Sequence, residues 1–423
     1  MSPVHRPRLN QIEGSRFCAI LSIVLYHIVV YGAAKQGIWG ATQCAKHAVC
    51  YFVVLSGFTT HYACKQTLLT REFACPGTNW RRIVIFYIQR VDRIAFLACL
   101  TTAGVLICAA VVGDPQNFFG RRDDLQHLAL CFTMTATFFD ASKGCPNQSL
   151  WFIGSLLVAW TVYPATQQLL QFLESRAGVQ GLLSFAVLIW GAHCWLVSAV
   201  VSTSADPSTQ FTWYFKPWPW QSSFIIGAVA SAVCCRLAGS SSDNSTGKDK
   251  RYDEETPLLT SPAAAAEDIR NGFTQSFLVR WALPVLADVF ALLEAFSLRQ
   301  DIVLTVDMER WVPLAWMYSS SLLFAGYLIC SCTSIMTGGY GGMLARLLSH
   351  PVLVGLGGYS FHVYVLHLPL LQTSLIIMPD HWLFANANVL FLVLVFTLAG
   401  FYAELIEKPL IPWLRKYYVP AAP

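Results

Sequence analysis

Residues 16–34 read RFCAILSIVLYHIVVYGAA, a single Arg followed by an almost entirely apolar run that contains one His. A transmembrane helix needs about 20 mostly apolar residues, so this stretch is long enough to cross a bilayer. An ionisable side chain inside such a span is costly, and its default interpretation is therefore functional. The stretch predicts a membrane fold and directs attention to His27.

The composition of the whole chain agrees with a membrane protein. Of its 423 residues, 55% are hydrophobic and only 12% are charged. The charged share is about half that of soluble domains, which excludes a disordered chain and argues against a soluble enzyme. The formal net charge of +4 is too small to indicate a nucleic-acid partner. The 14 Trp residues suit a protein that contacts membrane interfaces.

Similar apolar stretches recur along the chain. They cover residues 16–34, 45–64, 94–112, 150–172, 181–201, 222–237, 277–296, 312–332, 352–377 and 389–406. The pattern predicts an all-α, polytopic membrane bundle of about ten transmembrane helices. A shorter apolar stretch, residues 125–139, is interrupted by His127 and several threonines. Because it is too short for a span, we interpret it as a re-entrant or interfacial helix.

The positions of Lys and Arg predict the orientation. With ten spans and a cytosolic N-terminus, most of the 28 basic residues fall on the cytosolic side, so both termini are expected in the cytosol. The first apolar run lacks a small-residue cleavage pattern and is expected to be an uncleaved span. The bundle is then expected in two parts, residues 1–237 and 272–423, joined by a flexible cytosolic linker at 238–271 that is rich in Ser, Ala and charge.

This linker contains a short sequence with sorting character. Glu254, three spacer residues and then Leu258 and Leu259 resemble an acidic dileucine signal. Such a signal would bind sorting adaptors and direct the protein to lysosomes, vacuoles or endosomes. The plasma membrane remains the alternative destination.

The 14 cysteines do not form a disulfide framework, because most lie in or beside apolar stretches. Cys44 and Cys145 are the candidates for a lumenal disulfide. No Cys/His spacing of a metal site is present, so no metal is expected. The glycosylation sequences at Asn147 and Asn244 are expected to be unused, since the first is close to the membrane and the second is cytosolic.

Two sets of polar residues share a helix face. Arg16 and His27 are eleven positions apart, which is about three helical turns, so they lie on one face and roughly 16 Å apart along the axis. Ser360, Tyr364 and His367 follow the i, i+4, i+7 pattern of a single face. Both histidines are expected about 18 Å from the cytosolic edge, a shared depth that permits one site. The alternative is that these side chains only connect neighbouring helices.

A third set lies at the cytosolic interface. Arg90 and Arg93 are three positions apart on one helix face, and guanidinium groups bind phosphates with two parallel hydrogen bonds. Ordinary positive-inside anchoring would also explain them. Glu404 and Glu407, at the cytosolic end of the last span, could pair with these arginines, either in a structural role or to position them.

Taken together, these residues resemble the acyltransferase-3 family of integral membrane acyltransferases. The similarity covers nearly the whole chain and rests on five motifs: Arg16 and His27 in the first helix, Ser56-Gly57-Phe58 in the second, Arg90 and Arg93, the Ser360–Tyr364–His367 helix, and the closing Glu407-Lys408-Pro409-Leu410. One departure is the segment around Trp151, which keeps the Trp but has Leu where many bacterial members carry acidic residues.

The resemblance implies an acyl-coenzyme A donor, usually acetyl, and commonly a carbohydrate hydroxyl as acceptor. Arg16, Arg90 and Arg93 would hold the coenzyme's phosphates, and Arg16 would act beside the catalytic His27. His27 would serve as a general base or as an acyl carrier. The supporting or acceptor-binding residues would be Ser56, Trp151, Ser360, Tyr364, His367 and Glu407. The reaction would be an O-acetylation, with delivery across the bilayer if the acceptor enters from the lumen.

Two other functions also suit the sequence. A proton-coupled or other transporter could use buried Arg, His and Glu as a relay, but the two halves show no internal repeat. A scaffold or sorting receptor would have no need for buried histidines.

Overall fold

The computed structural model describes residues 8–32, 44–64, 76–112, 125–139, 145–203, 213–246, 278–308, 314–377 and 388–418. Within these residues the chain is all-α, with 14 α-helices. The long helices are α1 (Asn10–Gly32), α3 (Cys44–Cys64), α4 (Pro76–Val112), α8 (Leu150–Thr203), α10 (Gln221–Thr246), α12 (Leu283–Met308), α13 (Leu314–Met336), α16 (Ser360–Ile377) and α18 (Asn388–Phe401). The shorter ones are α6 (Leu125–Phe132), α7 (Ala136–Phe139), α14 (Met343–Leu348), α15 (Pro351–Gly357) and α19 (Lys408–Tyr418).

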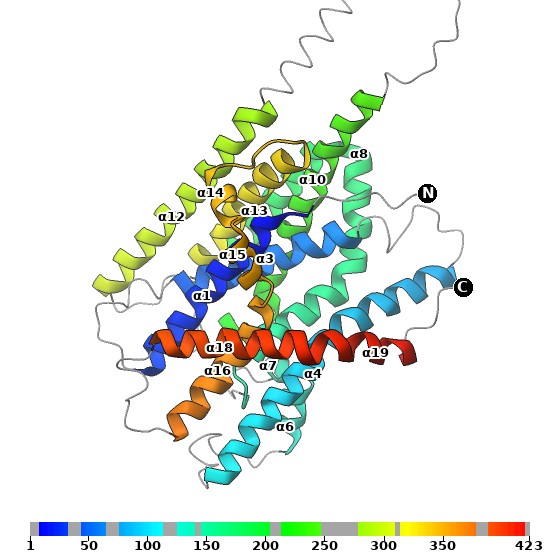
Figure 1. Cartoon of the computed structure of the whole chain (residues 1–423). Coiled ribbons are helices and arrows are strands. Elements are labelled where there is room, and N and C mark those ends of the chain that lie inside the picture. Colours follow the sequence, from blue (N-terminus) through cyan, green and yellow to red (C-terminus); the bar gives the residue numbers. More distant parts are fainter. Residues whose placement is uncertain are drawn as a thin grey trace, which may run out of the picture.

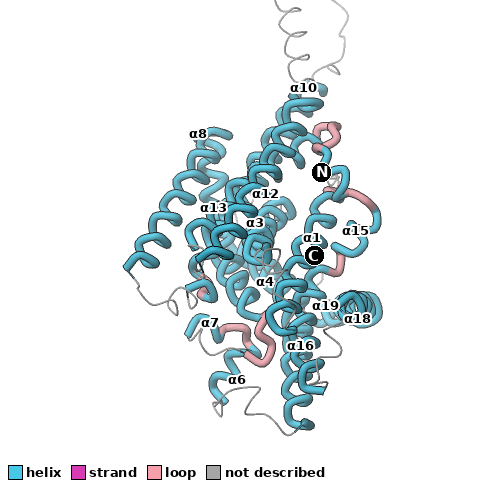
Figure 2. The backbone as a smooth tube through the Cα atoms, turned by 90° about the vertical axis from the view of Figure 1, so that its left-hand side faces the viewer, coloured by secondary structure: helices cyan, strands magenta, loops and turns pink. Residues whose placement is uncertain are grey.

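The helices form one bundle around α3 and α10. Helix α10 packs on α3, α8 and α13, and α1 packs on α3, α14, α15 and α16. Figure 1 shows α18 and α19 running as one rod across the front of the bundle, past α16 and α4. Figure 2 shows α6 and α7 at the end of the bundle opposite to the free end of α10.

The helices that could cross a membrane are fewer than predicted. Five described helices are long and apolar enough, or six if α15 and α16, which meet at a bend of 60°, form one span. The chain is therefore a multi-pass membrane protein, but the predicted count of ten is not confirmed. Part of the difference lies in α8, whose 54 residues include two of the predicted stretches. Non-helical Gly178, at φ 59°, breaks α8 between them.

Two segments outside the predicted spans also have described structure. The stretch 125–139 forms two short helices, α6 and α7, with Met134 at φ 60° between them, and neither is long enough to cross a bilayer. Helix α10 continues to Thr246, so the first part of the predicted linker is helical. The dileucine-like sequence at Glu254, Leu258 and Leu259 and the Asn244 side chain lie outside the described residues.

Glycines let the central helices touch. A Cβ at Gly57 of α3 would lie 1.9 Å from the carbonyl oxygen of Phe224 in α10, and a Cβ at Gly227 would lie 1.9 Å from that of Val54. Helices in membranes associate through such small residues because lipid removes the hydrophobic force between them. Gly57 and Phe58 therefore act in packing, with Phe58 fully buried beside this contact.

We expect Gly57→Ala to destabilise the bundle, because the added methyl group would push α3 away from α10. Overpacking of this kind costs about 1–3 kcal/mol or more. Gly104→Ala in α4 is the matched control, since nothing lies within 4 Å of a Cβ there. Thermal unfolding of both variants in detergent tests this expectation. Equal melting temperatures for Gly57→Ala and the wild type would show that the contact is not needed.

A buried hydrogen-bond cluster connects α3 to the peripheral helix α12. The Nδ1 atom of His47 lies 2.8 Å from a carboxylate oxygen of Glu294 and 2.9 Å from the hydroxyl of Ser320 in α13. All three side chains are buried. The contact places the carboxyl group of Glu294 toward the bundle, whereas Leu292 and Phe296 on the same helix are exposed.

Candidate active site

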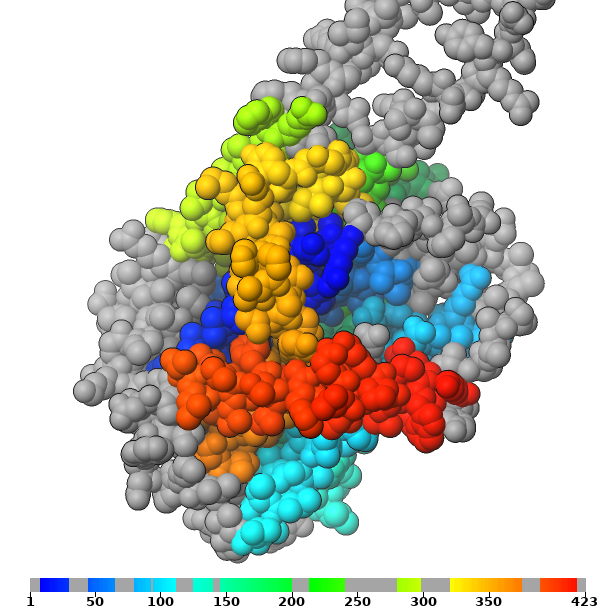
Figure 3. Space-filling view, viewed as in Figure 1, coloured from blue at the N-terminus to red at the C-terminus, as the bar shows by residue number. Residues whose placement is uncertain are grey.

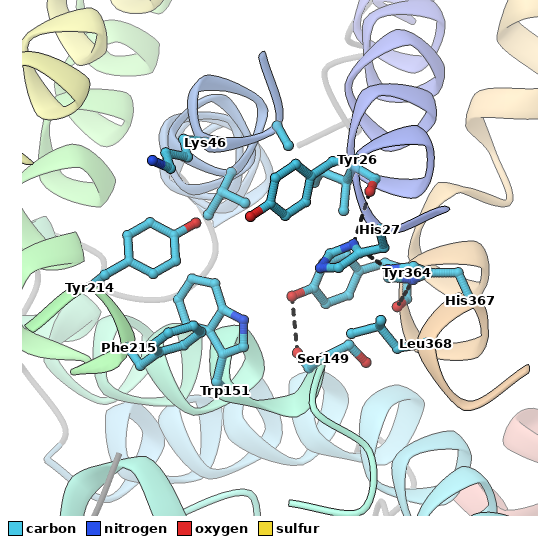
Figure 4. Close-up of a pocket in the computed structure, with 13 residues that line it drawn as sticks. Tyr26, His27, Lys46, Ser149, Trp151, Tyr214, Phe215, Tyr364, His367 and Leu368 are labelled. Atoms are coloured by element: carbon cyan, nitrogen blue, oxygen red, sulfur yellow. Dashed lines mark hydrogen bonds between the residues drawn. The ribbon is translucent and has the colours of Figure 1, made fainter. Parts of the chain in front are cut away.

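A cavity of about 90 Å³ lies between α1, α3, α8 and α16. Its lining consists of Ile23, Tyr26, His27, Ala45, Lys46, Val49, Ser149, Trp151, Tyr214, Phe215, Tyr364, His367 and Leu368. Figure 4 shows His27, Tyr364 and His367 on one side of this cavity and Tyr214, Phe215 and Trp151 on the other. The two histidines and Tyr364 therefore face a group of aromatic side chains, Trp151, Tyr214 and Phe215, which we call the aromatic wall.

The cavity lies near one end of the bundle. His27 is near the last turn of α1, whereas Lys46 and Trp151 belong to the first turns of α3 and α8. From Asn10 to His27, α1 rises about 25 Å at 1.5 Å per residue. The cavity is thus far from the end of the bundle at which α1 begins.

The two imidazoles predicted to share a depth are in contact. The Nε2 atom of His367 lies 3.1 Å from Nδ1 of His27, and their ring centroids are 5.0 Å apart. In His367, Nδ1 lies 2.7 Å from the carbonyl oxygen of Tyr364 and 3.2 Å from that of Val363. A carbonyl only accepts, so Nδ1 carries the hydrogen and Nε2 carries the lone pair of neutral His367.

This arrangement fixes the tautomer of His27. Its Nδ1 atom lies between two acceptors, the Nε2 lone pair of His367 and the carbonyl oxygen of Ile23 at 2.9 Å. Nδ1 of His27 must therefore be the N–H, and Nε2 carries the lone pair of the neutral ring. A lone pair held in a defined direction is what a general base or a nucleophile requires.

Tyr364 and Asn147 hold the surrounding backbone. The Tyr364 hydroxyl donates to the carbonyl oxygen of Ser149 at 3.0 Å. The Asn147 side chain donates to Thr101 of α4 at 2.9 Å and to the carbonyl oxygen of Val365 at 3.1 Å. These bonds fix the start of α8, and therefore Trp151, relative to the histidines. Asn147 is 0% exposed, which agrees with an unused glycosylation sequence.

The aromatic wall includes residues that the sequence analysis missed. Trp151 lies 5.0 Å from the ring of Tyr214 and 5.1 Å from that of Phe215. The Trp220 indole donates to the carbonyl oxygen of Tyr214 at 3.0 Å, which anchors this segment. The dense aromatic sequence of residues 213–220, WYFKPWPW, was the available signal. No sequence pattern around Lys46 marked it as a site residue. It is the one Lys or Arg among the residues that line this cavity.

Several predicted site residues lie outside this cavity. Ser360 is buried at the start of α16, Ser56 lies in α3, and neither lines the cavity. Arg16 binds the carboxylate of Glu13 at 2.9 and 3.0 Å. Arg90 lies over the ring of Phe86 at 5.4 Å and over that of Trp160 at 5.8 Å.

Glu404 and Glu407 contact residues other than Arg90, the arginine of the considered pairing whose side chain is described. Glu407 contacts His362, and Glu404 contacts Lys408 and Tyr359. The arginine that docks the end of the chain on α4 is Arg415, which makes a two-bond contact with Asp92 at 2.6 and 3.0 Å. Arg93 lies in α4, and its side chain is outside the described residues.

The predicted partner of Cys145 was wrong. Cys145 forms a disulfide with Cys131 at the end of α6, with His127 Nε2 3.6 Å from the Cys131 sulfur. Cys131 and Cys145 are only 14 positions apart, so the loop between them closes easily. The expectation had paired Cys145 with Cys44 because both lie outside the apolar stretches.

The family of the chain follows from comparison with known proteins. A family model described as an acyltransferase domain matches residues 9–403, which is nearly the whole chain. The chain belongs to the acyltransferase-3 family. Comparison with curated proteins and comparison with solved structures each returned no match. The protein is therefore a membrane acyltransferase, and the match covers the helices that build the cavity.

Proposed function

We propose that this acyltransferase moves an acetyl group from acetyl-coenzyme A to a hydroxyl of a carbohydrate or similar acceptor, with His27 as the catalytic base. The observation that carries the proposal is the contact between His27 and His367 in a cavity that is also lined by aromatic side chains. A bundle of ten spans with cytosolic termini would place the donor in the cytosol. The dileucine-like sequence favours an endomembrane compartment.

In the proposed reaction, Nε2 of His27 takes the proton of the acceptor hydroxyl while the hydroxyl oxygen attacks the thioester carbonyl carbon. The C–S bond then breaks as the new C–O ester bond is completed. The His27 imidazolium returns its proton to the departing thiolate, so the products are an O-acetyl ester and free coenzyme A. His367 is a positioning residue. Its Nε2 atom accepts a hydrogen bond from Nδ1–H of His27, and this contact directs Nε2 of His27 to the substrate.

An alternative use of the same atom is transfer through an acyl-histidine. In that case Nε2 of His27 would attack the thioester, coenzyme A would leave, and the acceptor hydroxyl would then take the acyl group. We favour the general-base route. A burst of coenzyme A equal to the enzyme concentration, formed without acceptor, would instead indicate the acyl-histidine.

The donor would reach this cavity from the end of the bundle where α1 begins. Arg16, Arg90 and Arg93 would bind its phosphates there, which requires Arg16 to exchange Glu13 for the ligand. The pantetheine arm would then extend along α1, where Arg16 and His27 are about 16 Å apart. Trp151 and Tyr214 would bind the acceptor, because aromatic rings with polar tips suit a ring that has apolar faces and hydroxyl edges.

The direct test is donor chemistry in purified protein. With acetyl-coenzyme A labelled in the acetyl group, the enzyme should release free coenzyme A or transfer label to carbohydrate acceptors. A transporter would do neither. Mass spectrometry of glycans and lipids from cells with and without the protein would then identify the acceptor by a lost acetyl group.

We expect short acyl chains to be strongly preferred. The cavity of about 90 Å³ is far smaller than the ~300–1,000 Å³ of drug-sized ligand sites, so the acyl group and the acceptor hydroxyl must share little space. Octanoyl-coenzyme A should therefore react at least ~100-fold more slowly than acetyl-coenzyme A, measured as kcat/KM for coenzyme A release. Equal rates for the two donors would contradict an acetyl-sized site.

A further inference from the structure

A second depression lies at the opposite end of α1 from the catalytic histidines. Its volume is about 350 Å³, and its lining is Arg8, Asn10, Gln11, Ile335, Tyr340, Arg346 and Ser349. Figure 3 shows the start of α1, in dark blue, at the surface beside the yellow segment that leads into α14. Three separate parts of the chain thus meet there: the residues before α1, the end of α13 and helix α14.

This depression is distinct from the proposed path of the donor. Gln11 and Arg16 are five positions apart on α1, which is a rotation of about 140° around the helix. Arg16 shares its face with His27, so Gln11 faces another side of α1. The packing of α14 and α15 against α1 keeps the two sides apart, since Gly14 and Gly357 bring these backbones into direct contact.

A buried amide side chain lies at this depression. Gln11 is 1% exposed, and its amide nitrogen lies 3.3 Å from the sulfur of Cys332. Its amide oxygen has no hydrogen-bond partner within the described part of the chain. Leaving a buried polar group without a hydrogen bond is costly, so Gln11 favours a ligand that supplies a hydrogen-bond donor.

The charges around Gln11 favour an anion. Arg8 and Arg346 both line the depression. The nearby carboxylates have other partners: Asp288 accepts from the backbone N–H groups of Met343 at 2.8 Å and Leu344 at 3.0 Å, and Glu13 binds Arg16. Two guanidinium groups beside an unsatisfied amide suit an organic phosphate, whose phosphate oxygens accept and whose hydroxyl or N–H groups donate.

We propose that this depression is a second ligand site that binds a phosphate monoester, with Arg8 and Arg346 on the phosphate and the Gln11 amide on a donor group of the same molecule. Tyr340 and Ser349 complete its rim. The ligand is either a free nucleotide or a phosphorylated lipid headgroup. The site does not depend on the acyl-transfer proposal, because none of its residues lines the cavity at His27.

The experiment uses the full-length protein in nanodiscs and two probes. One probe is uridine 5′-monophosphate in solution, a phosphate monoester that is not part of coenzyme A, added to nanodiscs of phosphatidylcholine alone. The other is phosphatidylinositol 4-phosphate, present in the nanodisc and measured as co-purified lipid by mass spectrometry. Arg346→Gln and Gln11→Leu test the site, and Arg176→Gln removes one exposed Arg from α8 as the charge-matched control.

We expect binding of at least one probe, weakened about tenfold or more by Arg346→Gln, which removes a charge-assisted hydrogen bond to the phosphate, and weakened to a smaller extent by Gln11→Leu, which removes a neutral one. Arg176→Gln and His27→Ala should bind as the wild type does. The probe that binds identifies the source of the phosphate. Binding unchanged in Arg346→Gln and Gln11→Leu, an equal loss in Arg176→Gln, or binding of neither probe would overturn the proposal.

Discussion

Replacement of His27 by alanine should lower the rate of acyl transfer by about 10²- to 10⁴-fold, which is the usual contribution of a general base. The physical reason is that in the proposed reaction Nε2 of His27 would take the proton of the acceptor hydroxyl, while Nδ1–H of His27 donates to His367 and to the carbonyl oxygen of Ile23. The rate of coenzyme A release from acetyl-coenzyme A, with acceptor present, measures the effect.

The control for His27→Ala is a measurement of whether the variant protein is still folded. His27 is partly exposed to the cavity, so removing its ring should leave the thermal unfolding midpoint close to that of the wild type. A second variant, His27→Asn, keeps a polar side chain and should be similarly inactive. If either variant retained full transfer, His27 would not be the base.

The second large effect is expected at His367. His367→Leu removes the acceptor that orients His27, and misplacement of a catalytic group by about 1 Å can cost ~10²-fold in rate. His367→Gln places an amide oxygen near the position of Nε2 and should recover much of the loss. The measurement is kcat for acetyl transfer by the two variants side by side.

A merely structural role for His367 would give a different pattern. If His367 acts through His27, adding His367→Leu to His27→Ala should slow the reaction little further, because residues that act as a unit are strongly non-additive. Independent, multiplying losses in the double variant, or a His367→Gln variant as slow as His367→Leu, would contradict the positioning role.

The polar half of the candidate site could be predicted from local spacing. His27 lies about three turns beyond Arg16, and Tyr364 and His367 share a face one turn apart, so their equal depth was available from helical geometry alone. Their contact at 3.1 Å additionally requires α1 and α16 to pack side by side, which the fold provides. The all-α membrane fold followed from hydropathy in the same way.

The other half of the site depends on tertiary packing. Lys46, Tyr214 and Phe215 come from the start of α3 and from the segment before α10, and no periodicity connects these places with His27. The disulfide of Cys145 shows the same limit, because connectivity among several cysteines cannot be deduced from spacing. Arg16 and Arg90 lie outside the cavity because an Arg at the interface end of a span is several turns away from a His deep within it.

The contact of Gly57 with α10 shows a further reason why the sequence alone does not define the site. The Ser56-Gly57-Phe58 sequence resembles a family motif, of which only Ser56 was expected to support the chemistry, and in the structure Gly57 packs closely on the backbone of Phe224 and Phe58 is fully buried. Sequence similarity identifies which residues the family needs. The packing then distinguishes those that hold helices together from those that face the cavity.

The most direct test of the account is a cryo-electron microscopy map of the protein with an unreactive thioether analogue of acetyl-coenzyme A. The account predicts the acetyl carbonyl carbon in the cavity between His27 and Trp151, about 3–3.5 Å from the site that an acceptor oxygen hydrogen-bonded to Nε2 of His27 would occupy. An analogue whose acetyl group lies outside this cavity, with the His27 ring sealed off from it, would contradict the account.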